Sequence, residues 1–177
     1  MKFLNLIALA GLSVAVFSTH AMAQDTAMAN IINNDAQNVG TIEIKQAPDG
    51  LLLHVNLDNM PVGKHGFHIH DNGTCEDNAD FKMAGGHIGK GDNKHGLMNP
   101  DGYEEGDLPN LIVPENGKVE VEFYVDDLKI ADADDKNDDE VLLDDNGAAF
   151  MIHENADDHM TQPIGGSGAR IACGVIK

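Results

Sequence analysis

The sequence has few basic residues, and this scarcity excludes several classes of partner. Its 177 residues include 11 lysines and arginines against 30 aspartates and glutamates, so the formal net charge is −19 with the histidines neutral. A surface this acidic repels the phosphates of nucleic acids and of anionic lipid headgroups. We therefore expect neither nucleic acid nor a membrane as a partner, and the same charge favours solubility.

Long apolar runs are also lacking outside the N-terminus. Lys2 precedes a mostly apolar run from Phe3 to Phe17, and Ala21-Met22-Ala23 supplies a small-residue cleavage pattern. This run falls short of the roughly 20 residues that span a bilayer, which argues against the alternative of a membrane anchor. The pattern predicts a secretory signal over residues 1–23, followed by one exported domain over residues 24–177.

Cysteine is nearly absent, with only Cys75 and Cys173 in the chain. In an exported protein an even pair is most simply a disulfide, and two free thiols are the alternative. The bridge would tie a glycine-rich loop to a C-terminal strand. Chain-entropy models give about 4 to 5 kcal/mol for closing a loop of this length.

Tryptophan is missing and no long stretch has a helical period, whereas glycine is abundant at 19 residues. Short apolar runs between glycine-rich turns are typical of strands. Together they predict an antiparallel β-sandwich or barrel with long functional loops. The expected strands are Val39–Gln46, Leu51–Leu57, Gly66–His70, Lys118–Val125, Ala148–His153 and Arg170–Ile176.

Two segments lack strand character. The segment from Asp71 to Pro114 is rich in glycine, asparagine, aspartate and histidine, and so long a loop usually carries function. The segment from Asp126 to Asp145 is strongly acidic, with one or two helical turns expected between residues 126 and 139. It lacks the glycine and glutamate positions of a calcium-binding loop, so we interpret it as a solvated acidic loop.

The histidines are clustered in a way that predicts a metal site. Alternate residues of a strand share a face, so His68 and His70 stand together on the face opposite the core. The same alternation places His153, at the end of a later strand, on this outer face. The glycine-rich loop adds His87 and His95. Imidazole suits copper and zinc, so we expect one of these metals here.

Several segments together resemble the copper/zinc superoxide dismutases, and in particular their bacterial periplasmic branch. The resemblance runs over nearly the whole exported domain. It implies an immunoglobulin-like Greek-key sandwich or barrel of about eight antiparallel strands, and an antioxidant enzyme that converts superoxide to oxygen and hydrogen peroxide as a monomer or homodimer. The matching segments are HGFHIH (65–70), GGH (85–87), KHG (94–96), GDLP (106–109) and GGSGARIACGVI (165–176).

The resemblance also implies two metal sites. In the first, copper is held by His68, His70, His87 and His153. In the second, zinc is held by His87, His95 and Asp107, so that His87 bridges the two ions.

Further residues receive roles from the same resemblance. Arg170 matches the arginine that guides superoxide to copper, and His87 carries a proton to the product. Asp157 matches a carboxylate that links a copper histidine to a zinc histidine, as residues behind metal ligands commonly do. Cys75 and Cys173 match the intrachain disulfide.

Other histidines and lysines receive weaker assignments. His65 lies on the opposite strand parity to His68 and is interpreted as a hydrogen-bonding residue behind the ligands. His54 is expected to be structural, on an early strand. The lysines near the ligand motifs, which could help to steer the substrate, are Lys64, Lys90 and Lys94.

One position departs from the family pattern. The family has a further zinc histidine three residues before Asp107, where this chain has Glu104. A glutamate oxygen can ligate zinc, so either Glu104 completes the zinc site or zinc binds weakly or not at all. His159 has no support from its position as a substitute and is expected to be a loop residue.

A competing interpretation uses the same histidines without turnover. A periplasmic copper-storage or copper-delivery module could be built on the same sandwich. Arg170 argues against it, because copper storage needs no arginine to guide a substrate.

Overall fold

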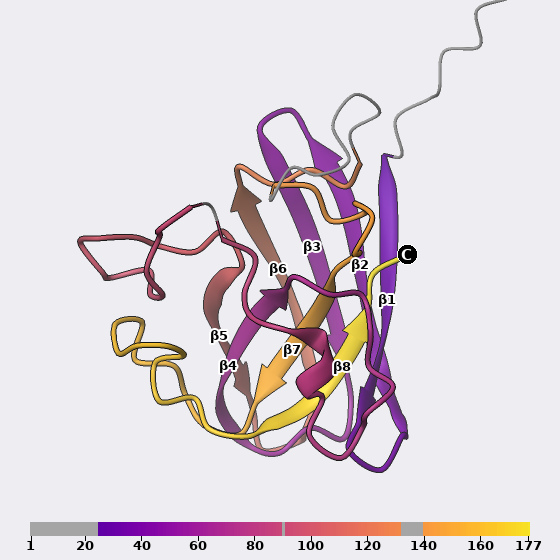
Figure 1. The fold of residues 1–177 in the computed structure, drawn as a ribbon. Coiled ribbons are helices and arrows are strands. Elements are labelled where there is room, and N and C mark those ends of the chain that lie inside the picture. The colour runs from indigo at the N-terminus through magenta and orange to yellow at the C-terminus, as the bar shows by residue number, and fades with distance from the viewer. Residues whose placement is uncertain (1–24, 90, 132–139) are drawn as a thin grey trace, which may run out of the picture.

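A computed structural model describes residues 25–89, 91–131 and 140–177. The expected signal over 1–23, Lys90, and most of the expected helical turn after residue 126 lie outside these ranges. The described chain contains eight strands and one short 3₁₀ helix (Figure 1). The strands are β1 Thr26–Asn33, β2 Asn38–Ala47, β3 Gly50–Leu57, β4 Gly63–His70, β5 Asp107–Val113, β6 Val119–Asp126, β7 Ala149–His153 and β8 Arg170–Val175, and the helix is η1 Lys82–Ala84.

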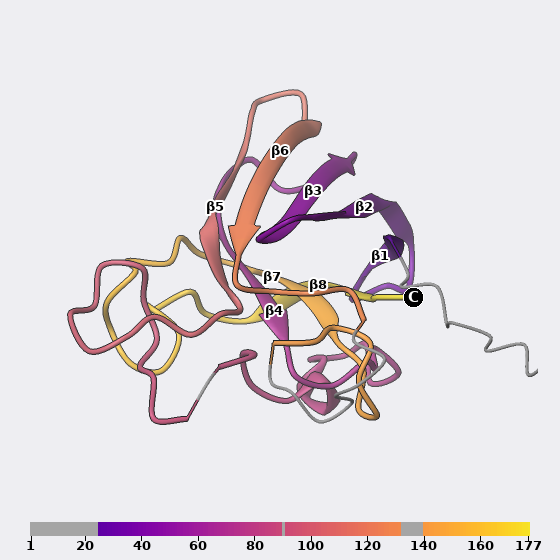
Figure 2. The same cartoon turned by 90° about the horizontal axis from the view of Figure 1, so that it is seen from above.

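The strands form one antiparallel sheet that curls into a nearly closed barrel. Their order is β5-β4-β7-β8-β1-β2-β3-β6, and every hydrogen-bonded pair is antiparallel. The view from above shows the sheet curving round until β5 and β6 lie near each other at its two ends (Figure 2). Eight antiparallel strands in a nearly closed barrel confirm the predicted all-β fold.

Two strands were not predicted from the sequence. Residues 107–113 were expected to belong to a long loop, but they form β5. Pro109 weakens the strand signal there, and β5 tolerates it because the strand lies at one end of the sheet. β1 was also missed, because two of its inward residues are the small side chains of Ala27 and Ala29.

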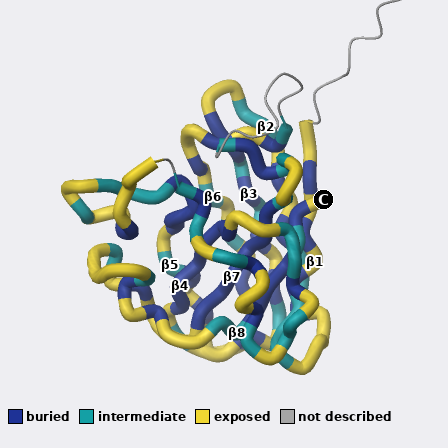
Figure 3. Tube along the Cα trace, in the orientation of Figure 1, coloured by how far each residue is buried: buried dark blue, intermediate teal, exposed yellow. Residues whose placement is uncertain are grey.

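The main core fills the inside of the barrel and follows from strand alternation. Phe67 and Ile69 of β4 face it, and Phe150 and Ile152 of β7 join them. The Phe67 and Phe150 rings stack with centroids 5.5 Å apart. Fully burying such a side chain contributes about 1.5–3 kcal/mol, so this packing fixes which face β4 and β7 turn outward. Figure 3 shows that buried residues concentrate in the strands, whereas the loops around them are mostly exposed.

A smaller apolar cluster lies on the outer face of the same strands. It contains the disulfide between Cys75 and Cys173, which the structure forms with an α-carbon separation of 5.9 Å. Phe81, at the start of η1, packs into this cluster with Met151 of β7. The disulfide therefore attaches the long loop after β4 to β8.

The only helix in the described part of the chain is the short η1. None of the described residues forms a helix long and apolar enough to cross a membrane.

Candidate metal centre

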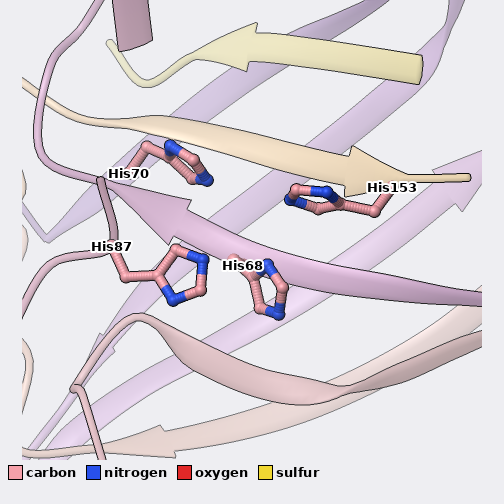
Figure 4. Close-up of side chains that lie close together, drawn as sticks. All are labelled: His68, His70, His87 and His153. Atoms are coloured by element: carbon pink, nitrogen blue, oxygen red, sulfur yellow. The ribbon is translucent and has the colours of Figure 1, made fainter. Parts of the chain in front are cut away.

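Four histidine rings meet on the outer face of the barrel (Figure 4). β4 presents His68 and His70 there, and β7 ends on His153. His87 comes from the loop after η1, where its backbone pairs with that of His70. One ring nitrogen from each of the four lies within 4.8 Å of the other three. The three strand histidines thus lie together on the outer face, as the alternation predicted.

Each of these rings has one nitrogen without a hydrogen-bond partner. Buried polar atoms normally have one, so four unpartnered nitrogens in one place need an explanation. A metal ion that accepts nitrogen ligands supplies it, and an all-imidazole set suits copper. The unpartnered atoms are His68 Nδ1, His70 Nε2, His87 Nε2 and His153 Nε2.

Burial keeps three of these rings neutral. It lowers the pKa of His68 to about 4, although a hydrogen bond to Asp157 opposes the change. Burial also lowers the pKa of His153 to about 3, and that of His70 well below its usual value, with the positive potential of neighbouring groups adding to the effect. Metals bind neutral imidazole, so these rings are ready to coordinate near neutral pH.

A second cluster surrounds the other nitrogen of His87. His87 Nδ1 lies 2.9 Å from Asp107 Oδ1 and 3.0 Å from Glu104 Oε2. His95 Nδ1 lies 2.7 Å from the same Asp107 oxygen and 3.9 Å from the same Glu104 oxygen. His87, His95 and Asp107 belong to a group, with His68, whose ligand atoms all lie within 4.8 Å of one another, and Glu104 lies close to two of its rings. Nitrogen and carboxylate oxygen donors of this kind suit zinc. His159, which was expected to be a loop residue, is not part of this group.

The charges of this second cluster differ from those of the first. Burial alone would lower the pKa of His95, but hydrogen bonds to Asp107 and Asp157 outweigh it and raise the pKa to about 10. The pKa of His87 is raised in the same way by Asp107 and Glu104, against the effect of burial. Without metal, the ring of His95 therefore holds a proton between carboxylates near neutral pH, and a dication would replace that proton.

Asp157 joins the two clusters through their outer nitrogens. Its Oδ2 accepts from His68 Nε2 at 2.8 Å, and its Oδ1 accepts from His95 Nε2 at 3.1 Å. The backbone N–H of His159 donates to the same Oδ1 at 2.6 Å. One carboxylate therefore fixes a ring of each cluster, which is the arrangement that the sequence comparison implied.

Asn110 of β5 holds Asp157 in place, and sequence reasoning missed it. Its side chain donates to the Asp157 carbonyl and accepts from the Asp157 N–H, each at 2.8 Å. It also lies 3.1 Å from His159 Nε2. No signal distinguishes this asparagine from its neighbours in the sequence, because its role depends on β5, which was expected to be loop.

The remaining predicted histidines lie outside the two clusters. His65 is buried, with its ring nitrogens 2.8 Å from the His153 carbonyl and 2.9 Å from that of Pro61, so it supports the backbone of a cluster residue. His54 lies on β3, where it is partly exposed and 4.0 Å from Glu120.

Arg170 is held beside the four-histidine cluster. It pairs across the sheet with His153, and its guanidinium donates to the carbonyls of Phe81 at 2.6 Å and Gly85 at 2.7 Å. Burial lowers the pKa of Arg170, and nearby carboxylates oppose this change. An arginine keeps its charge in proteins, so one fixed positive group stands next to the imidazoles. Lys64 and Lys94 are exposed.

The fold and these two clusters define a class of β-barrel protein in which a single imidazole lies between two adjacent groups of side chains that could hold metal ions. Residues 38–176 match the family model for copper/zinc superoxide dismutase. The chain belongs to this family.

Relatives and solved structures agree with this assignment. The superoxide dismutase [Cu-Zn] of Caulobacter vibrioides is 40% identical over 153 residues, which cover 86% of each chain. The Cu/Zn superoxide dismutase of Brucella abortus superposes with a TM-score of 0.66 at 32% identity, covering 86% of this chain and 99% of that one. A double mutant of a SOD-like protein from Bacillus subtilis gives a TM-score of 0.77 at 43% identity, covering 84% and 95%.

Proposed function

We propose that this protein dismutates superoxide with a copper ion held by His68, His70, His87 and His153. The observation that carries the proposal is the convergence of four buried ring nitrogens, none of which has a partner. Copper supplies the one-electron redox chemistry that zinc lacks. The balanced reaction takes two superoxide anions and two protons to one oxygen and one hydrogen peroxide.

Two residues at the cluster supply the other functions that the reaction needs, which are anion binding and proton transfer. Arg170 offers a positive charge that is fixed beside His153, so it attracts and orients an anion there. His87 has an unpartnered Nε2 facing the cluster, while its Nδ1 faces two carboxylates. It can hold a proton at Nε2 and give that proton to the peroxide product as the product leaves.

We propose further that zinc occupies the second cluster and that Glu104 is one of its ligands, with His87, His95 and Asp107. The short distance from Glu104 Oε2 to His87 Nδ1, 3.0 Å, supports this ligand set. Metal analysis of the purified protein tests it, with one zinc per copper expected. Cobalt in the same site should give a tetrahedral visible spectrum that changes in Glu104→Gln. Copper alone, or an unchanged cobalt spectrum, contradicts the ligand role.

Pulse radiolysis separates the enzyme from a copper-storage module. The copper-loaded protein should accelerate superoxide decay catalytically, and the metal-free protein should not. Stoichiometric copper binding without catalysed decay would support storage instead and overturn the proposal. Loading with zinc alone is the matched control, because zinc cannot change its oxidation state.

We propose that the protein acts in the periplasm. Its disulfide supports an oxidising compartment, and the apolar N-terminal segment over residues 1–23 supports export. Fractionation of the native cells, followed by N-terminal sequencing of the purified protein, tests this. A chain that starts at residue 24 in the periplasmic fraction is expected, and an uncleaved chain in the cytoplasm would contradict it.

A further inference from the structure

The loop between the disulfide and His87 holds Arg170 in place. Arg170 belongs to β8, but its guanidinium donates to two carbonyls of this loop, at Phe81 and Gly85. The Gly85 carbonyl also accepts from His70 Nδ1 at 3.0 Å. The position of the guanidinium relative to the four histidines therefore depends on how the backbone turns between Phe81 and Gly85.

Asp77 organises that turn from its start. Its backbone carbonyl accepts from the Phe81 N–H at 2.9 Å, and its carboxylate Oδ2 accepts from the Met83 N–H at 2.9 Å. Phe81 is fully buried and has a left-handed backbone with φ of 50°, which is disfavoured for a bulky residue. The turn therefore depends on partners such as Asp77 to keep this conformation.

The carboxylate of Asp77 also acts on Arg170 through its charge. Among the carboxylates that raise the pKa of Arg170 against the effect of burial, Asp77 has the largest effect, ahead of Asp80 and Asp71. Its second oxygen, Oδ1, is buried and accepts no hydrogen bond from the described residues. Leaving a buried acceptor unpaired costs free energy.

We propose that Asp77 is a positioning residue that fixes the turn holding Arg170 and thereby sets how tightly an anion binds beside the four histidines. The inference rests on the proposed function in using Arg170 as the anion-holding group. The hydrogen bond and the charge of Asp77 act in opposite directions. Losing the hydrogen bond loosens Arg170 and weakens anion binding, whereas losing the negative charge strengthens it.

Azide binding to the copper-loaded protein separates these two effects. Azide is an anion that gives a charge-transfer band on Cu(II), so its dissociation constant can be measured without turnover. Asp77→Asn keeps an oxygen acceptor for Met83 and removes the charge, so azide should bind as tightly as in the unaltered protein or more tightly. Asp77→Ala removes both, and its dissociation constant should rise about three- to tenfold above that of Asp77→Asn.

Two further variants show that the effect passes through Arg170. Asp80→Asn makes the same charge change at a half-exposed side chain that pairs with Lys82, so azide affinity should not fall. Arg170→Ala should weaken azide binding, and adding Asp77→Ala to it should weaken binding no further. An additional loss in the double variant would mean that Asp77 acts independently of Arg170, which overturns the inference.

The failure of this inference can be distinguished from the failure of the proposed function. If the unaltered protein holds no copper, or its copper catalyses no superoxide decay, the proposed function fails. If it holds copper and binds azide, but Asp77→Ala and Asp77→Asn have equal affinities, only the inference fails. Should Asp77→Ala load less copper, the measurement still holds, because the azide band reports only on protein that contains Cu(II).

Discussion

The two nitrogens of His87 face two environments that differ in charge and in how they are built. On the Nε2 side lie three rings with pKa values lowered by burial. On the Nδ1 side lie the carboxylates of Asp107 and Glu104, and there the pKa of His95 is raised to about 10. One half of the centre offers neutral ligands to a metal, whereas the other half must first lose protons.

The supports of the two halves also differ. The first half is carried by β4 and β7, whose inward residues pack in the barrel core, and His68, His70 and His153 are fully buried. The second half depends mainly on the loop after β4, and the side chain of Glu104 is 25% exposed. We therefore expect a metal in the first half to be held by a more rigid frame, and a metal in the second to exchange more readily.

Removing a ligand from the first half should give the largest effect. His153→Ala takes one of four nitrogens from the proposed copper site, so copper affinity should fall by at least about 100-fold and catalysed superoxide decay should disappear. Zinc content should remain, because His153 is not part of the second cluster. Metal analysis and pulse radiolysis measure both quantities.

The control for this variant is His54→Ala, on β3 and away from both clusters. It should retain copper and activity. If His153→Ala kept full copper affinity, the four-histidine site would be wrong. If it lost zinc as severely as copper, the two halves would not be separable.

Asp157→Asn removes the carboxylate that contacts both His68 of the first cluster and His95 of the second. Outer partners of metal ligands typically contribute 10- to 100-fold in affinity, and we expect about this loss for zinc, because the ring of His95 loses a carboxylate partner at Nε2. Copper should be affected less, because strand packing also fixes His68. Competition with chelators measures both affinities, and Glu154→Gln, at an exposed residue in the same loop, is the control. Equal losses for the two metals would contradict the idea that the four-histidine cluster is held by a more rigid frame than the second cluster.

The same difference explains which parts of the site could be predicted. His68, His70 and His153 follow from strand alternation alone, because the barrel core dictates which face they occupy. The proposed zinc ligands His95 and Asp107 required the family resemblance, because a loop gives no such geometric rule. Their convergence on His87 depends on backbone conformations that sequence periodicity does not encode.

Some contacts that hold the site in place cannot be inferred from the residue types in the sequence. Arg170 is fixed by two backbone carbonyls, and every residue has a carbonyl, so sequence cannot show which ones are used. Asn110 clamps Asp157 through both of its side-chain polar atoms, but this role is visible only once β5 is known to be a strand. Pro109 obscured that strand because proline is rare inside sheets.

Arg170→Glu should lower the rate of superoxide decay at the four-histidine cluster without removing its copper. The charge reversal repels an anion beside the histidines, so we expect roughly a tenfold or greater loss of rate at low salt with copper still bound. Added salt should shrink the difference, because charges are screened beyond about 10 Å at 0.1 M ionic strength. Pulse radiolysis at several salt concentrations tests this, and identical rates at all of them would contradict a steering role for Arg170.

The smallest and sharpest difference is the number of protons that each metal displaces. In the metal-free protein near pH 7, the pKa of His95, raised to about 10, keeps this ring protonated, and the carboxylates raise the pKa of His87 as well. Zinc uptake should therefore release between one and two protons per ion. Copper bound to the zinc-loaded protein should release only the proton on His87 Nε2, because the rings of His68, His70 and His153 are already neutral. Calorimetry in buffers of different ionisation enthalpy measures both values. Equal proton release for the two metals would mean that the two faces of His87 do not differ in charge as the carboxylates require.

The same pKa shifts predict how the stability of the metal-free protein depends on pH. The raised pKa of His95 stabilises the fold below the unfolded pKa near 6.5, and this contribution is lost as pH rises toward 10. The lowered pKa of His153 costs stability as pH falls from 6.5 toward 3.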